Sequence, residues 1–97
     1  MINRERLISE LVDDVRYEML SSIECGFDYM NFEKDFGKAT VCVEVREHRL
    51  QNGFYGDDMD VYITHEGNQQ SPRLEKAIRA ALPNWWDVRR EVLRQIA

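Results

Sequence analysis

The sequence predicts an α+β domain with two layers, in which helices cover one face of a three-stranded antiparallel sheet. Three observations lead to this prediction. The first quarter of the chain carries apolar residues at helical spacing, two central segments alternate apolar with polar residues, and helical spacing returns in the last third. The predicted order is α-β-β-β-α-α, and 97 residues suffice for one domain, 1–97, with a single core.

The first helix is expected to begin after Asn3, a residue type that accepts hydrogen bonds from the first turn of a helix. Ile2 and Leu7 are placed to pack across that turn. Glycine often supplies the left-handed residue that ends a helix, so this helix should stop near Cys25-Gly26. Its predicted apolar stripe consists of Ile8, Leu11, Val12, Val15, Met19 and Ile23.

Three central segments are predicted to form the sheet. A first strand covers residues 27–32 and is followed by a turn around 35–37. The clearest strand, 40–48, alternates valine with polar residues, and the third strand places Met59, Val61 and Ile63 on one face.

The register of the second and third strands follows from matching their apolar faces. The predicted pairs are Val43 with Ile63, Val45 with Val61, Arg46 with Asp60, and His48 with Asp58. A two-residue turn at Asn52-Gly53 alone would offset this register by one residue. A bulge at Gly56-Asp57 is therefore expected to restore it.

The last third of the chain predicts two helices. Ser71 caps the first, Pro72 occupies its first position, and Pro83 ends it. Asn84 caps the second, with Asp87 in the first turn, where the helix dipole favours a negative charge. The apolar stripe of the first consists of Leu74, Ala77, Ile78, Ala81 and Leu82, and that of the second of Trp85, Val88, Val92 and Ile96.

Composition and charge narrow the class of protein. Hydrophobic residues at 43% and charged residues at 32% are ordinary for a soluble globular protein, and no apolar run is long enough to span a bilayer. The start is charged and does not resemble a signal peptide. Cys25 and Cys42 form neither a metal-type pair nor a disulfide framework, so we expect reduced thiols in a cytoplasmic protein without a membrane partner.

Residues 55–58, Tyr-Gly-Asp-Asp, repeat the sequence of the metal-binding turn of many RNA-dependent polymerases. That turn needs apolar strands on both sides and a further aspartate, whereas the upstream segment 48–54 is mostly polar. The favoured interpretation is structural, with the carboxylates paired to basic residues across the strands. A cation site formed by His48 with Asp57, Asp58 and Asp60 stays open as an alternative.

The sequence contains no phosphate-binding glycine loop, no nucleophile motif and no zinc-binding helix motif. Cys42 alternates onto the polar face beside Glu44, and nearby acids raise the pKa of a thiol. We therefore expect a protein that is not an enzyme and that needs no cofactor. A metal-dependent enzyme using the acidic hairpin is the third choice.

The last two helices permit a second hypothesis. Residues 71–82 and 85–97 have about the lengths of a helix-turn-helix, and the second segment carries Arg89, Arg90 and Arg94. A small DNA-associated regulator is therefore the alternative function. Residues 1–70 carry 7 Lys and Arg against 15 Asp and Glu, which opposes binding to duplex phosphates, so nucleic acid is not the expected partner.

The preferred hypothesis is a small intracellular accessory or protein-interaction module. Trp85 falls on the core stripe of the last helix, whereas Trp86, Arg89 and Leu93 lie along its flank and form a candidate interaction patch. Tryptophan and arginine are enriched in protein interfaces. The expected partner is an unknown protein or a second copy of the chain in a homodimer.

Overall fold

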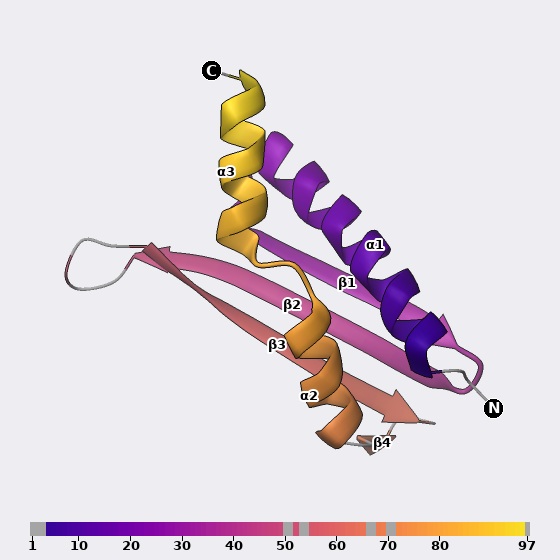
Figure 1. Ribbon diagram of the computed structural model, residues 1–97. Helices are drawn as coiled ribbons and strands as arrows, with labels where there is room; N and C mark the ends of the chain where they lie inside the picture. Colours follow the sequence, from indigo (N-terminus) through magenta and orange to yellow (C-terminus); the bar gives the residue numbers. More distant parts are fainter. Residues whose placement is uncertain (1–3, 50–51, 53–54, 66–67, 70–71, 97) are drawn as a thin grey trace.

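The computed structural model describes residues 4–49, 52, 55–65, 68–69 and 72–96. The elements are α1 (Arg4–Glu24), β1 (Tyr29–Phe36), β2 (Ala39–Arg49), β3 (Tyr55–His65), β4 (Asn68–Gln69), α2 (Pro72–Ala81) and α3 (Trp85–Ile96). Within these residues the strands form one antiparallel sheet in the order β1-β2-β3-β4 (Figure 1). The predicted fold class and element order are confirmed, and the two-residue β4 is an addition to them.

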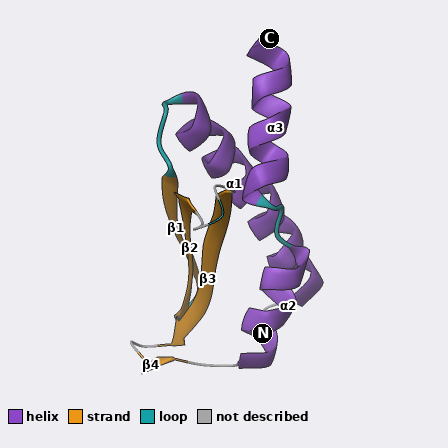
Figure 2. Cartoon of the chain, turned by 90° about the vertical axis from the view of Figure 1, so that its left-hand side faces the viewer, coloured by secondary structure: helices purple, strands orange, loops and turns teal. Residues whose placement is uncertain are grey.

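The molecule has two layers. All the described helices lie on one face of the sheet, and no described helix covers the other face (Figure 2). Helix α1 packs on β1, α2 packs on β3, and α3 packs beside α1. The side chain of Glu75 in α2 accepts a hydrogen bond of 2.9 Å from the backbone N–H of Ile63, which attaches α2 to β3.

The core lies between the helices and the covered face of the sheet. Its strand residues are Met30, Val41, Val43, Val45, Val61 and Ile63, and its helix residues are Leu7, Leu11, Val15, Met19, Ile78, Leu82, Trp85, Val88 and Val92. The predicted valine face and the stripe of α3 through Val92 are confirmed. The stripe of α1 is turned slightly, because Leu7 is buried while Ile8 and Val12 are only partly buried. Ala81, expected in the stripe of α2, is exposed.

The ends of the helices follow the predicted signals where they are described. Gly26 has a φ of 83° and ends α1, and the N–H groups of Gly26 and Phe27 bond the carbonyls of Ile23 and Ser22. Asn84 caps α3 through its Oδ1, which accepts from the N–H of Trp86 at 2.9 Å. The predicted caps Asn3 and Ser71, with Ile2, lie outside the described residues.

The predicted register of β2 and β3 is wrong by two residues. Val45 stands opposite Met59 and Val43 opposite Val61, in a ladder that pairs every residue from Ala39 to Arg49. A shift of two leaves each side chain on its predicted face, so the faces are correct although the pairs are not. The described ladder of β2 and β3 contains no bulge. In the observed register residues 50–54 connect the two strands, so the extra residue that the predicted register needed is not required. Gly53 of the predicted turn lies outside the described residues.

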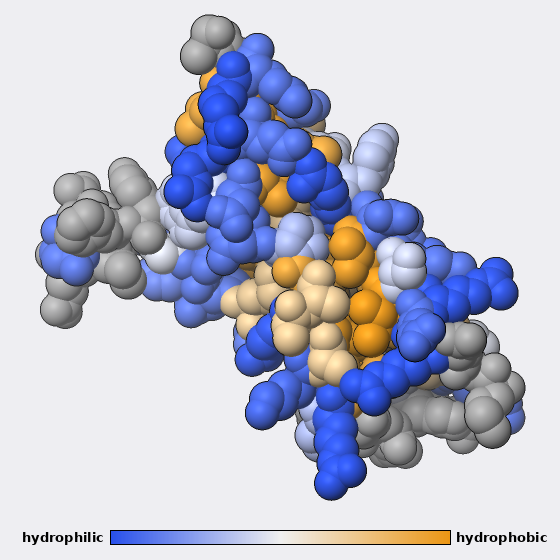
Figure 3. Space-filling model, in the orientation of Figure 1, coloured by the Kyte–Doolittle hydropathy of each residue, from blue (hydrophilic) through white to orange (hydrophobic). Residues whose placement is uncertain are grey.

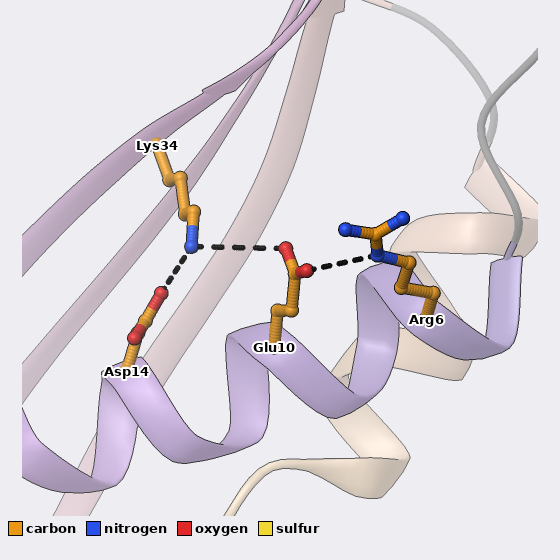
Figure 4. Close-up of polar contacts among 4 residues, drawn as sticks. All are labelled: Arg6, Glu10, Asp14 and Lys34. Atoms are coloured by element: carbon orange, nitrogen blue, oxygen red, sulfur yellow. Dashed lines mark hydrogen bonds and ion pairs between the residues drawn. The ribbon is translucent and has the colours of Figure 1, made fainter.

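Strand β1 begins two residues later than the predicted 27–32, at Tyr29, and extends further. It continues through Phe36, and the turn follows at Gly37, whose φ is 62°. The reason is Lys34, which alternates onto the covered face although it is charged. Its ammonium group bonds Asp14 and lies 3.9 Å from Glu10, both on α1 (Figure 4). The two carboxylates stabilise the charged ammonium group of Lys34 at this position, so the strand can continue past it.

Candidate interaction surface

The three residues of the predicted patch on α3 have different surroundings. Trp86 and Arg89 pack on each other, whereas Leu93 is exposed. The guanidinium of Arg89 lies over the ring of Trp86, 5.1 Å from its centroid, and Trp86 is half-buried against the core. Leu93 is 52% exposed, whereas Trp85 is fully buried as expected. The exposed apolar surface of this helix flank is therefore centred on Leu93.

Arg89 is held by a carboxylate that the prediction missed. Glu47 of β2 accepts hydrogen bonds from Arg89 and, at 3.0 Å, from the indole Nε1 of Trp85. The Glu47 side chain is only 10% exposed. Glu47 continues the alternation of Val43 and Val45, and this pattern alone indicates a side chain that faces the helices. Glu47 attaches α3 to the sheet.

A second ion pair fixes α3 against α1. Arg16 donates from Nη2 to both carboxylate oxygens of Glu91 at 2.6 Å. The hydrogen bond from Arg16 lowers the pKa of Glu91. The pair therefore links α1 to α3 at the surface of the molecule.

A hollow of about 230 Å³ opens between α3 and the loop that follows α1, and its lining is mixed, with Asp28, Glu47 and Arg89 as charged members. Ile23, Phe27, Val92 and Leu93 supply its apolar lining, and we call these four residues the α1–α3 surface. Phe27 is 52% exposed, and its ring lies 5.5 Å from that of Tyr29. The predicted patch thus extends from Leu93 across to the loop after α1.

A second hollow, of about 270 Å³, lies between α1 and α2. Leu7, Val41, Ile63 and Leu74 contribute to its lining, with Arg73 among its polar residues. Apolar side chains come to the surface between these helices in the space-filling view (Figure 3). This hollow borders directly on the core.

The acidic tetrapeptide belongs to a strand rather than to a turn. Residues 55–58 open β3, and alternation sends Asp57 to the covered face and Asp58 and Asp60 to the uncovered one. Asp58 stands opposite Arg46, and its carboxylate lies 3.6 Å from Nδ1 of His48. The predicted pair of Arg46 with Asp60 is wrong, and the predicted proximity of His48 and Asp58 is diagonal rather than direct.

The carboxylates of this strand do not converge. In the described part of the chain, no three His, Cys, Asp or Glu side chains stand close enough to hold a metal ion. Burial raises the pKa of Asp57, and the neighbouring acids Asp58 and Glu47 raise it further. Asp57 therefore loses its proton less readily than an ordinary aspartate.

The thiol of Cys42 is poorly suited to nucleophilic chemistry, and two of the arginines of α3 are already paired with carboxylates. Burial, and then the nearby Glu33, raise the pKa of the Cys42 thiol, in the predicted direction, so the nucleophilic thiolate is disfavoured. Arg89 pairs with Glu47, and Arg90 pairs with Asp87. Two of the arginines that suggested DNA binding thus already have carboxylate partners within the chain.

Comparisons with known proteins give no family: no family model matches the chain, and neither a curated protein nor a solved structure matches it. None of the helices in the described residues is long and apolar enough to cross a membrane.

Proposed function

We propose that this protein is a non-enzymatic interaction module of the cytoplasm, whose α1–α3 surface binds another protein. The single observation that carries the proposal is the hollow at this surface, where Phe27 and Leu93 are each half exposed beside buried Val92. Exposed apolar side chains around a hollow are typical of contact sites between proteins.

The support beneath the surface favours the same function. Glu47 and Glu91 pair with Arg89 and Arg16, so the apolar side chains are presented by elements that are already linked to one another within the chain. A preformed surface loses less conformational entropy on binding than a flexible one. The cytoplasm is part of the proposal because Cys25 and Cys42 form no disulfide framework in the sequence.

The first partner to test is a second copy of the chain. Multi-angle light scattering at high protein concentration measures the mass in solution, and we expect a dimer for the wild type. Leu93→Ser should shift the mass to that of a monomer, because it removes an apolar side chain of α3 that is 52% exposed.

Tyr17 provides the matched control. It is 69% exposed on α1 and does not line the hollow, so Tyr17→Ser removes a comparable apolar area elsewhere. The control should remain a dimer. A wild-type monomer at every concentration would eliminate the homodimer and leave a different protein as the partner. A dimer that survives Leu93→Ser would place self-association on another surface.

A further inference from the structure

The uncovered face of the sheet is strongly acidic. Its outward positions carry the carboxylates of Glu33, Asp35, Glu44, Asp58 and Asp60. On the described strands the only lysine or arginine with this outward orientation is Arg46, with His48 as a further basic group. No described helix packs on this face (Figure 2), so these charges have no cover within the described molecule.

Two of the carboxylates stand directly opposite each other. Glu44 of β2 pairs with Asp60 of β3, and like charges in this arrangement destabilise a sheet. The hydroxyl of Tyr62 donates to Glu44 at 3.1 Å, which orients the carboxylate and raises the pKa of Tyr62 to about 12. The fold therefore holds an unfavourable pair of charges in place, and a cation from outside would relieve the repulsion.

These residues surround an open hollow. A depression of about 370 Å³ is lined by Tyr29, Glu44, Arg46, Asp58 and Asp60, so three carboxylates share it with a single arginine. A second depression of the same volume adjoins it and shares Asn31 and Glu44. Tyr29 stands opposite Arg46, and the surplus of carboxylates over this one arginine suits further guanidinium or ammonium groups.

The arrangement of the charges excludes two occupants. A single metal ion does not fit, because no three ligand-type side chains converge within the described residues. A second copy bound through the same face would bring its own carboxylates against these, and like-charge contact between partners is costly. The complementary occupant is a ligand that carries several positive charges spread along its length.

We propose that the uncovered sheet face binds an extended segment of a partner protein that carries Lys or Arg at alternate positions. Asp58 and Asp60 are two residues apart on β3 and face the same way. Alternate residues of an extended segment have the same repeat, so each carboxylate can meet one cation. This site is separate from the α1–α3 surface, and it goes beyond the function proposed for that surface.

The test is a binding measurement with two synthetic peptides. One is an end-blocked peptide of about eight residues in which arginine alternates with serine, and the other has the same composition with its arginines consecutive. Fluorescence anisotropy follows binding at about 20 mM and about 150 mM salt, because exposed ion pairs are screened by salt. We expect the alternating peptide to bind more tightly and to weaken as the salt concentration rises.

Two charge-matched double variants locate the site. Asp58→Asn with Asp60→Asn removes the two carboxylates that the extended segment is proposed to meet, and Asp13→Asn with Glu24→Gln removes two exposed acids from α1. The first should weaken binding of the alternating peptide by about tenfold, since two exposed ion pairs are lost. The second should change it by less than about twofold. Circular dichroism confirms that each variant is folded.

Three outcomes would overturn the proposal. The first is the absence of wild-type binding to the alternating peptide at the lower salt concentration. The second is an equal loss in both double variants, which would show attraction to the net charge alone. The third is equal binding of the two peptides, which would show that binding does not require cations at alternate positions. Leu93→Ser should leave peptide binding unchanged, so failure of this site is distinguishable from failure of the α1–α3 surface.

Discussion

Glu47 and Asp57 stand directly opposite each other on β2 and β3, on the face of the sheet that the helices cover. The two carboxylates have different surroundings. Glu47 accepts hydrogen bonds from Trp85 and Arg89, whereas burial is the main influence on Asp57. One acid is therefore an anchor for α3, and the other opposes the stability of the fold at neutral pH.

Removal of the anchor should destabilise the protein. Glu47→Ala leaves the guanidinium of Arg89 and the indole N–H of Trp85 without their shared acceptor, and we expect a loss of about 2–3 kcal/mol in the free energy of unfolding. Urea denaturation followed by tryptophan fluorescence measures this loss. Glu44→Gln, on the uncovered face, is the control and should not destabilise. A cost below about 0.5 kcal/mol for Glu47→Ala would show that α3 is held by packing alone.

Asp57 should make stability depend on pH in an unusual direction for an acid. Its pKa is raised in the folded protein, so the folded state keeps the proton that the unfolded chain loses above about pH 3.9. The contribution of Asp57 to the free energy of unfolding therefore falls as the pH rises between these two pKa values. Asp57→Asn should stabilise the protein at pH 7, by less than about 1 kcal/mol because the group is partly exposed, and the gain should vanish below about pH 4.

Urea denaturation at several pH values checks this prediction for Asp57. Asp58→Asn is the neighbouring control, since Asp58 is exposed. A variant at Asp57 that is less stable than the wild type at pH 7 would contradict the prediction, because it would mean that the charged form has a favourable partner.

Lys34 should protect the free edge of the sheet. Strand β1 is an edge strand in the described sheet, and an inward-pointing charge discourages another strand from pairing with such an edge. Lys34→Val removes that charge and leaves Asp14 without its cation. We expect association that grows with concentration, measured by light scattering. Lys38→Val, in the turn after β1, is the control. A variant at Lys34 that scatters like the wild type would show that the edge is protected in another way.

Gly26 offers a test of backbone strain without steric contact. Its φ of 83° is unfavourable for other residues, yet an added Cβ would meet no atom within 4 Å. Gly26→Ala should therefore cost about 1 kcal/mol from conformation alone. Gly26→Asn should cost less, because asparagine tolerates left-handed backbone. Thermal unfolding ranks the variants, and equal losses for both would point to a cause other than the φ angle.

The fold could be predicted because its signals are local. The valine alternation in β2, the helical stripe of α3 and the end of α1 at Gly26 each depend on residues close together in sequence. The register of β2 and β3 could not, since matching the apolar faces leaves a choice between registers two residues apart. The two registers differ in the number of residues that connect the strands, here 50–54, and the alternation of side chains does not indicate that number.

The candidate site was only partly predictable for the same reason. Trp86, Arg89 and Leu93 share a helix flank, which the sequence reveals through helical spacing. Phe27 and Ile23 join Leu93 only because the chain brings α1 back against α3, and the pairing of Glu47 with Arg89 spans 42 residues. Contacts over such separations need the tertiary fold. The opposed acids Glu44 and Asp60 were missed because the predicted register placed Arg46 there instead.

The bond between Arg16 and Glu91, separated by 75 residues, has a consequence for the order in which the fold can assemble on a ribosome. The hairpins of the sheet are local and can form while the chain is being made. The apolar faces of β3 and of α1 then wait for α2 and α3 respectively, which are synthesised after every strand. Until α3 emerges, the nascent protein exposes a surface that chaperones recognise and that other chains can join. Slow translation of the residues after β4 would lengthen that exposure.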